Sequence, residues 1–215
     1  MPEPATMTLL GTGFAAMAVQ YLRRKYHSVK PWFDRCVAAV LLVIFAPVLG
    51  ICALLIKLTS RGPVLYKQER VGEKGQIFEI LKLRTMHVNA EKCTGPMWSP
   101  GDNDPRVTTF GRFLRRSHLD ELPQLVNVLR GEMSLVGPRP ERPYFVEQLR
   151  KVVPDYEKRL AVKPGITGLA QVRSGYDRTI RDVRRKVKLD SMYIRRMCWW
   201  VDFVVMARTF RKFVG

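Results

Sequence analysis

The chain has 215 residues, enough for one domain plus membrane segments, and its 37 Lys and Arg residues against 19 Asp and Glu residues give a formal net charge of +18. A chain this basic is expected to bind phosphate-bearing partners, namely nucleic acid, anionic lipid or a diphosphate substrate. The four cysteines lack the spacing of a zinc site or a disulfide framework, and the three histidines are scattered, so the composition favours a reducing compartment and argues against a Cys/His metal centre.

Two apolar stretches open the chain. Residues 8–22 are short for a membrane span and end in Arg23-Arg24-Lys25, which leaves a signal-like helix, an interfacial helix and the remnant of a longer span open. Residues 36–56 carry no charge and are long enough to cross a hydrocarbon core of about 30 Å. Their composition favours a plain span, but Pro47 at the midpoint would kink the helix. Basic residues flank both ends, so the positive-inside rule gives no orientation, and a helix that turns back at Pro47 would place both flanks on one side.

The next segments alternate between apolar and polar residues. Residues 64–70 and 77–86 are predicted to be strands joined by a turn at 72–75. Lys82 and Arg84 lie in the second strand, either on a solvated face or in contact with a substrate. Residues 94–105 have the composition of a loop, and residues 109–116 are predicted to form a basic amphipathic helix.

The central run, residues 115–140, reads RRSHLDELPQLVNVLRGEMSLVGPRP. We expect Asp120 to cap a short helix that begins at Glu121, tolerates Pro123 in its first turn and stops at Gly131. A carboxylate at the positive end of a helix would be favoured in its ionised form, near a bound phosphate, with Arg115 adding charge one turn upstream. The alternative is that Asp120 only caps the helix and Glu121 only complements its dipole.

Two Pro- and Gly-rich motifs follow. In Gly137-Pro138-Arg139-Pro140 the prolines stiffen the backbone, which suits Arg139 for bidentate capture of a phosphate, although a plain turn with an exposed arginine is the alternative. Residues 163–171 read KPGITGLAQ and are predicted to form a loop, where Gly165 and Gly168 would let backbone approach a ligand closely. Gln171 could recognise a base or sugar, or simply make a loop-end hydrogen bond.

The last third is predicted to be helical. Residues 144–160 and the strongly charged residues 176–196 are expected to form helices, the latter with a solvated face, and Asp190 lies in its LDSMYI segment. Residues 192–214 mix aromatic with basic side chains, which suits the bilayer interface; a core helix with a basic outer face is the alternative.

Long ordered motifs connect this chain to a known family. Residues Asp104 to Pro140, followed by Pro164 to Val172, resemble the signature of bacterial sugar transferases, the monotopic phosphoglycosyl transferases. The resemblance runs from about Pro31 to the C-terminus and omits the first 25 or so residues. It implies an α/β, mainly helical fold with one re-entrant membrane helix hairpin broken at Pro47, and a small catalytic domain on the cytosolic face with amphipathic interfacial helices. The family's helix breaks at a Ser-Pro-like pair, for which this chain has Ala46-Pro47.

The resemblance also implies a division of the chain and a reaction. Residues 1–30 would be an N-terminal segment of unknown role, 31–60 the re-entrant helix and 61–215 the catalytic domain. The reaction would move a sugar-1-phosphate from a UDP-sugar to polyprenyl (undecaprenyl) phosphate and release UMP, which initiates exopolysaccharide, O-antigen or glycoprotein glycan assembly. The resemblance assigns Asp120 as the nucleophile that forms an acyl-phosphate and Glu121 as its catalytic partner, with both as Mg²⁺ ligands. The phosphate-binding residues would be Arg115, Arg139, Lys82 and Arg84. Gln171 and Asp190 would make secondary contacts with the substrate.

The same resemblance places the protein at the cytoplasmic face of the bacterial inner membrane. Its partners would be the UDP-sugar, polyprenyl phosphate and membrane lipids, with no nucleic acid, and a homodimer is allowed. Two other functions stay open. A non-catalytic basic membrane protein that binds anionic lipid accounts for the charge and the apolar run, but not for Asp120-Glu121 followed by Pro-Arg-Pro and PGITG. A phosphatase or hydrolase would use the same aspartate with water as the acceptor.

Overall fold

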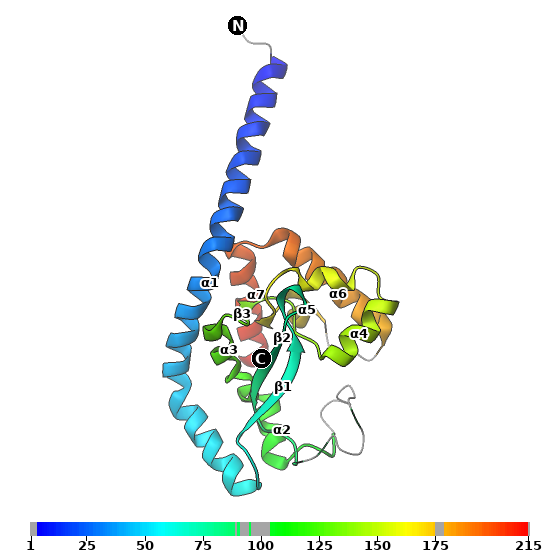
Figure 1. Ribbon diagram of the computed structural model, residues 1–215. Coiled ribbons are helices and arrows are strands. Elements are labelled where there is room, and N and C mark those ends of the chain that lie inside the picture. Colours follow the sequence, from blue (N-terminus) through cyan, green and yellow to red (C-terminus); the bar gives the residue numbers. More distant parts are fainter. Residues whose placement is uncertain (1–3, 89, 91–94, 96–103, 175–178, 215) are drawn as a thin grey trace.

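The computed structural model describes residues 4–88, 90, 95, 104–174 and 179–214. These residues are mainly helical and form two small two-stranded sheets, in agreement with the mainly helical α/β part of the predicted fold class. One very long helix, α1, runs along one side of a compact domain, and its N-terminal part projects beyond that domain (Figure 1). Most of the predicted loop at 94–105 and the first residues of the predicted helix at 176–196 lie outside the described residues.

Helix α1 (Pro4–Thr59) is continuous over 56 residues and contains both Pro31 and Pro47. The two apolar stretches that the sequence separates therefore lie in one helix, and neither a break at Pro47 nor a hairpin is confirmed. A proline inside a helix removes one hydrogen bond and bends the helix without having to end it, and α1 curves through its C-terminal part (Figure 1). Within the described part of the chain, α1 alone is long and apolar enough to cross a membrane: in Gln20–Thr59 an 18-residue window reaches a mean hydropathy of 3.0, with 11% of it buried.

The predicted hairpin is confirmed. Strands β1 (Leu65–Val71) and β2 (Ile77–Leu83) pair antiparallel, with Leu65 opposite Leu83 and Val71 opposite Ile77. The connection contains the 3₁₀ turn η1 (Glu73–Gly75), where Lys74 and Gly75 have positive φ.

The next elements carry the central motif. Helix α2 (Thr109–Arg116) matches its predicted bounds, and the Thr108 side chain caps it by accepting a hydrogen bond from the Gly111 amide. A 3₁₀ turn, η2 (Leu119–Glu121), leads to helix α3 (Gln124–Arg130), which ends at Gly131 with φ +79°, the left-handed stop that the sequence predicts. The short strand β3 (Ser134–Val136) follows.

The C-terminal part is broken into more elements than the sequence indicates. The predicted helix at 144–160 is divided into α4 (Pro143–Val152) and the 3₁₀ helix η3 (Tyr156–Ala161), because the residue before Pro154 is disfavoured in the α region. The predicted loop at 163–171 contains β4 (Gly165–Thr167) and the start of α5 (Leu169–Arg173), and β4 pairs parallel with β3. Helices α6 (Ile180–Arg196) and α7 (Trp199–Val214) complete the fold.

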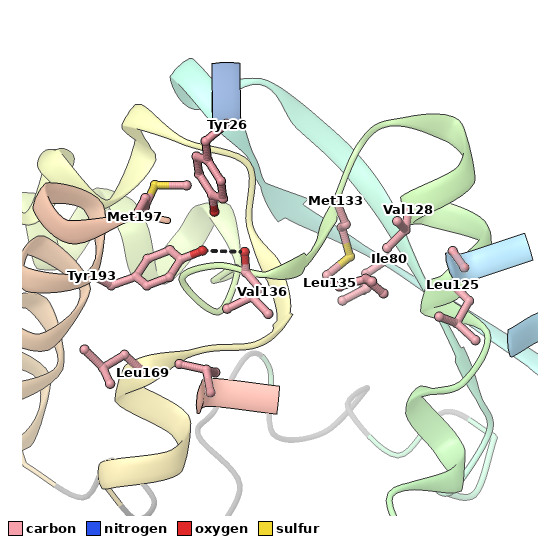
Figure 2. Packing of buried hydrophobic residues seen from close by; sticks show 12 residues of the cluster. Tyr26, Ile80, Leu125, Val128, Met133, Leu135, Val136, Leu169, Tyr193 and Met197 are labelled. Carbon is pink, nitrogen blue, oxygen red and sulfur yellow. Dashed lines mark hydrogen bonds between the residues drawn. The ribbon is translucent and has the colours of Figure 1, made fainter. Parts of the chain in front are cut away.

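Helix α1 takes part in the core of the domain at two places. Its residues Tyr26 and Ala38 belong to the main apolar cluster, which also draws on β2, α3, β3, α6 and α7 (Figure 2). Further along, Cys52 and Ile56 pack with Leu83 and Leu114 in a separate cluster. A third cluster joins α4, η3 and α6 away from α1. The apolar segment of α1 is thus attached to the same domain near both of its ends.

A buried polar network fixes α1 on the domain. Asp202 of α7 accepts hydrogen bonds from the Tyr26 hydroxyl (2.7 Å) and the Lys30 ammonium (2.5 Å), and its other oxygen lies 2.8 Å from the Tyr193 hydroxyl. One helical turn beyond Lys30, Asp34 accepts from the Ser134 hydroxyl at 2.5 Å. The attraction between such buried ionic groups is largely offset by the cost of removing them from water. Their main effect here is therefore to specify the position of α1 on the domain.

Candidate active site

Asp120 lies in the 3₁₀ turn η2, after His118 with φ +54°. Helix α3 begins only at Gln124, so the predictions that Asp120 caps this helix and that Glu121 is its first residue are wrong. Pro123 has no N–H, so it cannot make an α-type bond back to the Leu119 carbonyl. The turn instead closes with shorter-range bonds, from the Glu121 amide to the His118 carbonyl (3.1 Å) and from the Leu122 amide to the Leu119 carbonyl (3.3 Å).

The Asp120 side chain is buried, with 7% exposure. Burial raises the pKa of Asp120, and the neighbouring cations Lys82, Arg139 and Arg115 oppose that rise. Among the described residues, none donates a hydrogen bond to the Asp120 carboxylate. The ionised form is therefore supported by side-chain cations and not by the helix dipole that the sequence suggested, and the carboxylate keeps its lone pairs for a ligand or an electrophile.

Glu121 is held by two cations from separate elements. Its Oε1 accepts hydrogen bonds from Lys82 Nζ on β2 (2.7 Å) and from Arg139 Nη2 (2.5 Å), and its Oε2 accepts from Arg139 Nη1 (3.2 Å). Burial alone would raise the pKa of Glu121, but Arg139 and Lys82 hold that pKa well below its usual range. Burial lowers the pKa of the Lys82 ammonium, while Glu121 opposes the change. Glu121 is thus an anchored carboxylate that arranges two cations beside Asp120.

The two signature motifs pair with each other through their backbones. Gly137 N donates to the Thr167 carbonyl (2.8 Å), and Gly165 N donates to the Pro138 carbonyl (2.9 Å). A Cβ atom on Gly165 would lie 2.1 Å from Gly137 N, and one on Gly168 would lie 2.2 Å from Gly137 O. These two glycines therefore let one backbone approach another, whereas the sequence suggested an approach to a ligand. The motif at 164–172 supports the segment that carries Arg139.

The remaining predicted residues have structural contacts of their own. Arg84 donates from Nη2 to the carbonyl (2.8 Å) and hydroxyl (2.7 Å) of Ser60, just past the end of α1. Arg115 donates from Nε to Thr85 Oγ1 (3.0 Å), close enough to Asp120 to oppose the rise in its pKa. The structure thus brings Asp120, Glu121, Lys82 and Arg139 together, with Arg115 nearby.

The two secondary candidates contact other protein groups. Gln171 Nε2 donates to the Ile166 carbonyl (3.0 Å), which is the loop-end hydrogen bond that the sequence left as an alternative. Asp190 is 1% exposed and pairs with Arg159 at 3.0 Å. Their predicted contact with substrate stays a prediction.

Two arginines near the motifs were not predicted from the sequence, and Asp104 was identified only as the start of the long motif. Arg159 and Arg70 are arginines that donate to backbone carbonyls on either side of Pro140, and nothing in their local sequence distinguishes them from solvated cations. Asp104 opens the long motif and is 1% exposed. It accepts a bidentate pair of hydrogen bonds from Arg106 (2.8 and 2.7 Å), which hold the pKa of Asp104 below its usual range.

The donors available for Mg²⁺ are few. Over the described residues there is no group of three or more His, Cys, Asp or Glu side chains that could hold a metal ion. Mg²⁺ commonly binds through one or two carboxylates together with waters and substrate phosphates. Asp120 fits that pattern, since its carboxylate accepts no hydrogen bond from the described residues. In Glu121, Oε1 accepts two hydrogen bonds and Oε2 accepts one, so one acceptor site on Oε2 is left for a metal ion beside Lys82 and Arg139.

Comparison with known proteins decides the family. Residues 25–215 match the family model described as bacterial sugar transferase. The chain belongs to the bacterial sugar transferase family. The match begins inside the continuous helix α1 of this sugar transferase, and residues 2–25 separately match the PEP-CTERM protein-sorting motif. The sequence analysis missed that second match, for which Pro2-Glu3-Pro4 before an apolar stretch and a basic cluster was the available signal.

Three relatives show how far the similarity extends. The sugar transferase is 41% identical over 186 residues to the UDP-N-acetylgalactosamine-undecaprenyl-phosphate N-acetylgalactosaminephosphotransferase of Aeromonas hydrophila, covering 86% of this chain and 44% of that protein. It is 45% identical over 178 residues to the UDP-glucose:undecaprenyl-phosphate glucose-1-phosphate transferase of Caulobacter vibrioides (82% and 66%) and 42% identical over 187 residues to the protein of that name from Escherichia coli (85% and 39%). The chain thus spans less than two thirds of the length of each.

Proposed function

We propose that this protein transfers a sugar-1-phosphate from a UDP-sugar to polyprenyl phosphate, through a covalent intermediate on Asp120, and so starts the assembly of a bacterial glycan. The observation that carries the proposal is a buried carboxylate without a hydrogen-bond donor among the described residues, set beside Glu121, Lys82 and Arg139. Relatives named as UDP-glucose or UDP-N-acetylgalactosamine transferases acting on undecaprenyl phosphate support the substrate classes.

The chemistry divides into two displacements at one phosphorus atom. A carboxylate oxygen of Asp120 forms a bond to the β-phosphorus of the UDP-sugar, and the bond from that phosphorus to the bridging oxygen breaks, so that UMP leaves with the electron pair. A phosphate oxygen of the polyprenyl phosphate then attacks the same phosphorus and releases the Asp120 carboxylate. The products are polyprenyl diphosphate sugar and UMP.

The neighbours of Asp120 have complementary tasks. Attack by an anion on a diphosphate requires positive charge at the site, and Lys82 and Arg139 supply it. Glu121 uses two of the five N–H groups of Arg139, and the Arg139 side chain is 38% exposed, so donors remain for a phosphate. When bound, Mg²⁺ would neutralise part of the diphosphate charge, held by an Asp120 oxygen, substrate oxygens and water.

We further propose that the protein is monotopic on the cytoplasmic face of the bacterial inner membrane, with residues 36–56 bent into one leaflet. The two attachments of α1 to the domain support this topology. Ala38 and Ile56 are both buried against the catalytic domain, whereas the two ends of a helix that crosses a core of about 30 Å are separated by the membrane.

The outward surfaces suit this placement. The face of α1 between these attachments is exposed and apolar, and so is a face of α7; the residues are Val40, Val43, Ile44, Ile51, Leu54, Leu55, Trp200, Phe203 and Phe210. Helix α7 at the same time buries Asp202 and Val205 in the domain. One face of α7 is therefore part of the core, and its exposed aromatic face supports the proposed placement at the bilayer interface.

The deciding experiment measures UMP release by purified protein in detergent, with Mg²⁺, undecaprenyl phosphate and a panel of UDP-sugars. We expect wild type to turn over one of these donors only when lipid is present, and Asp120→Asn to lower the rate by about 10³-fold or more. Asp155→Asn is the matched control, because Asp155 is exposed and pairs only at the surface with Lys158.

Other outcomes point to other functions. Release by Asp120→Asn at the wild-type rate would contradict the covalent mechanism. Sugar phosphate formed without lipid would identify a hydrolase that uses water as the acceptor. Absence of release from every donor, together with loss of lipid binding in lysine and arginine variants, would favour a non-catalytic lipid-binding protein.

A further inference from the structure

The segment that carries Arg139 is anchored at nearly every backbone carbonyl. Its two prolines have no N–H to donate, so the carbonyls provide most of its attachment. The five donors come from four elements, namely α6, β4, η3 and β1. They are Tyr193 Oη to Val136 O (2.9 Å), Gly165 N to Pro138 O (2.9 Å), Arg159 Nη2 to Arg139 O (2.8 Å), Arg70 Nη1 to Pro140 O (3.0 Å) and Val71 N to Glu141 O (2.9 Å). The contact at Arg139 itself is made by a buried charged side chain.

Arg159 is fixed by three further contacts. It is 6% exposed, and its Nη1 donates to the Tyr156 hydroxyl at 3.0 Å while the guanidinium lies over the Tyr156 ring. Asp190 of α6, 1% exposed, lies 3.0 Å from its Nη2. A buried ion pair is weak evidence for stability, because desolvation offsets its attraction, and the best-attested reason to keep one is the arrangement that it specifies.

We propose that Arg159 and Asp190 are positioning residues for Arg139, which set where its guanidinium lies relative to Asp120 without touching the substrate. Asp190 orients Arg159, and Arg159 holds the main-chain carbonyl of Arg139. The Arg139 side chain then reaches Glu121 in the turn that carries Asp120. This inference rests on the proposed function, in which Arg139 holds the donor diphosphate, and it gives Asp190 an indirect role in place of a substrate contact.

The expected size of the effect follows from the geometry. Without Arg159 the Arg139 carbonyl loses its charged donor, while the neighbouring carbonyls of Pro138 and Pro140 keep theirs. The segment therefore shifts without detaching. A displacement of about 1 Å at a group that positions a substrate lowers kcat/KM by about 10²-fold. The loss should be mainly in kcat/KM for the donor sugar, whereas a general loss of folded protein would lower the amount of active enzyme and leave KM unchanged.

The experiment is a double-mutant cycle for UMP release in detergent, with the UDP-sugar that wild type uses. Asp190→Asn and Arg159→Lys are each combined with Arg139→Lys; Arg159→Lys keeps a cation for Asp190 but loses the fork that reaches both Tyr156 and Arg139. We expect each single variant to lower kcat/KM by about 10²-fold, and Asp190→Asn to change it by less than about threefold once Arg139 is already lysine. Glu157→Gln is the control, since Glu157 lies in the same 3₁₀ helix as Arg159 and the substitution removes only an exposed ion pair with Arg150 of α4.

If the fold-losses in kcat/KM of the two single variants multiply in the double variant, Asp190 acts independently of Arg139, and that result would overturn the inference. Hydrogen exchange by mass spectrometry on the same variants gives a readout that needs no activity. We expect faster exchange in residues 134–142 of Asp190→Asn and Arg159→Lys than in Glu157→Gln, and unchanged exchange there would equally overturn it. If wild type releases no UMP from any donor, the proposed function fails, and the exchange measurement alone decides the positioning role.

Discussion

Gly165→Ala is expected to be a severe substitution although it adds a single methyl group. The new Cβ would lie 2.1 Å from Gly137 N, 2.5 Å from Thr167 O and 2.6 Å from Gly137 Cα, all backbone atoms that cannot rotate away. Since carbon contacts are comfortable only at about 3.5 Å, β3 and β4 must separate by roughly 1 Å. The hydrogen bonds between Gly137 and Thr167 and between Gly165 and Pro138, now 2.8 and 2.9 Å, would then exceed bonding distance.

Overpacking and the loss of two hydrogen bonds should together lower the free energy of unfolding by about 2–4 kcal/mol. In a chain of this size that corresponds to a drop in Tm of roughly 5–15 °C. Because Arg139 follows Pro138 directly, the same shift should lower kcat/KM for UMP release by about 10²-fold. Gly50→Ala is the matched control, since a Cβ on Gly50 meets nothing within 4 Å and alanine is the better helix former.

Thermal unfolding in detergent and UMP release are measured on both variants. Gly50→Ala should keep the wild-type Tm or raise it slightly, with unchanged activity. If Gly165→Ala behaves like Gly50→Ala, the close backbone pairing is not essential. If it loses stability but keeps its kcat/KM, the pairing does not control the position of Arg139.

Two further predictions concern charge and topology. Because the folded-state pKa of Glu121 is depressed, Glu121 stabilises the fold above its unfolded-state pKa of about 4.3, and this contribution is lost as pH falls through the folded-state pKa. Between pH 6 and pH 3 the free energy of unfolding in urea should therefore fall more steeply for wild type than for Glu121→Gln. Parallel profiles would contradict this. Cysteines placed at Lys25 and Arg61, with the four native cysteines replaced, should both react with an impermeant maleimide from the cytoplasmic side of the membrane, and reaction from opposite sides would exclude a monotopic helix.

Local sequence patterns correctly predicted the elements that are determined by neighbouring residues. Alternating apolar residues with a Gly-containing turn predicted the β1–β2 hairpin, and Gly131 predicted the end of α3 because a left-handed residue there satisfies the last carbonyls. The resemblance also marked Glu121, Lys82 and Arg139 as site candidates, and the structure places them in contact, while their roles stay predictions.

The failures have tertiary or steric causes. The helix start at Asp120 was wrong because residues 119–121 close a 3₁₀ turn after His118, which has positive φ, and Pro123 has no N–H with which to convert that turn into α-helix; the capping preference of aspartate alone does not set the start. The single helix α1 was divided because proline and charge suggest breaks, whereas packing against the domain holds the helix together on both sides of Pro31. Arg159 was missed because a buried arginine and a solvated one look alike until the partners from α6 and the Arg139 segment are known.

The polar network between α1 and the domain also fixes the position of the domain along the axis of α1. An apolar interface would tolerate a slip by one helical turn, about 5.4 Å, whereas a slip here would separate Lys30 from Asp202 and Asp34 from Ser134 at once. With residues 36–56 in the membrane as proposed, the helix would hold Asp120 at a constant distance from the lipid. Under this proposal the domain would keep a constant distance from the lipid, and the distance of an acceptor's phosphate from the bilayer would contribute to acceptor selection.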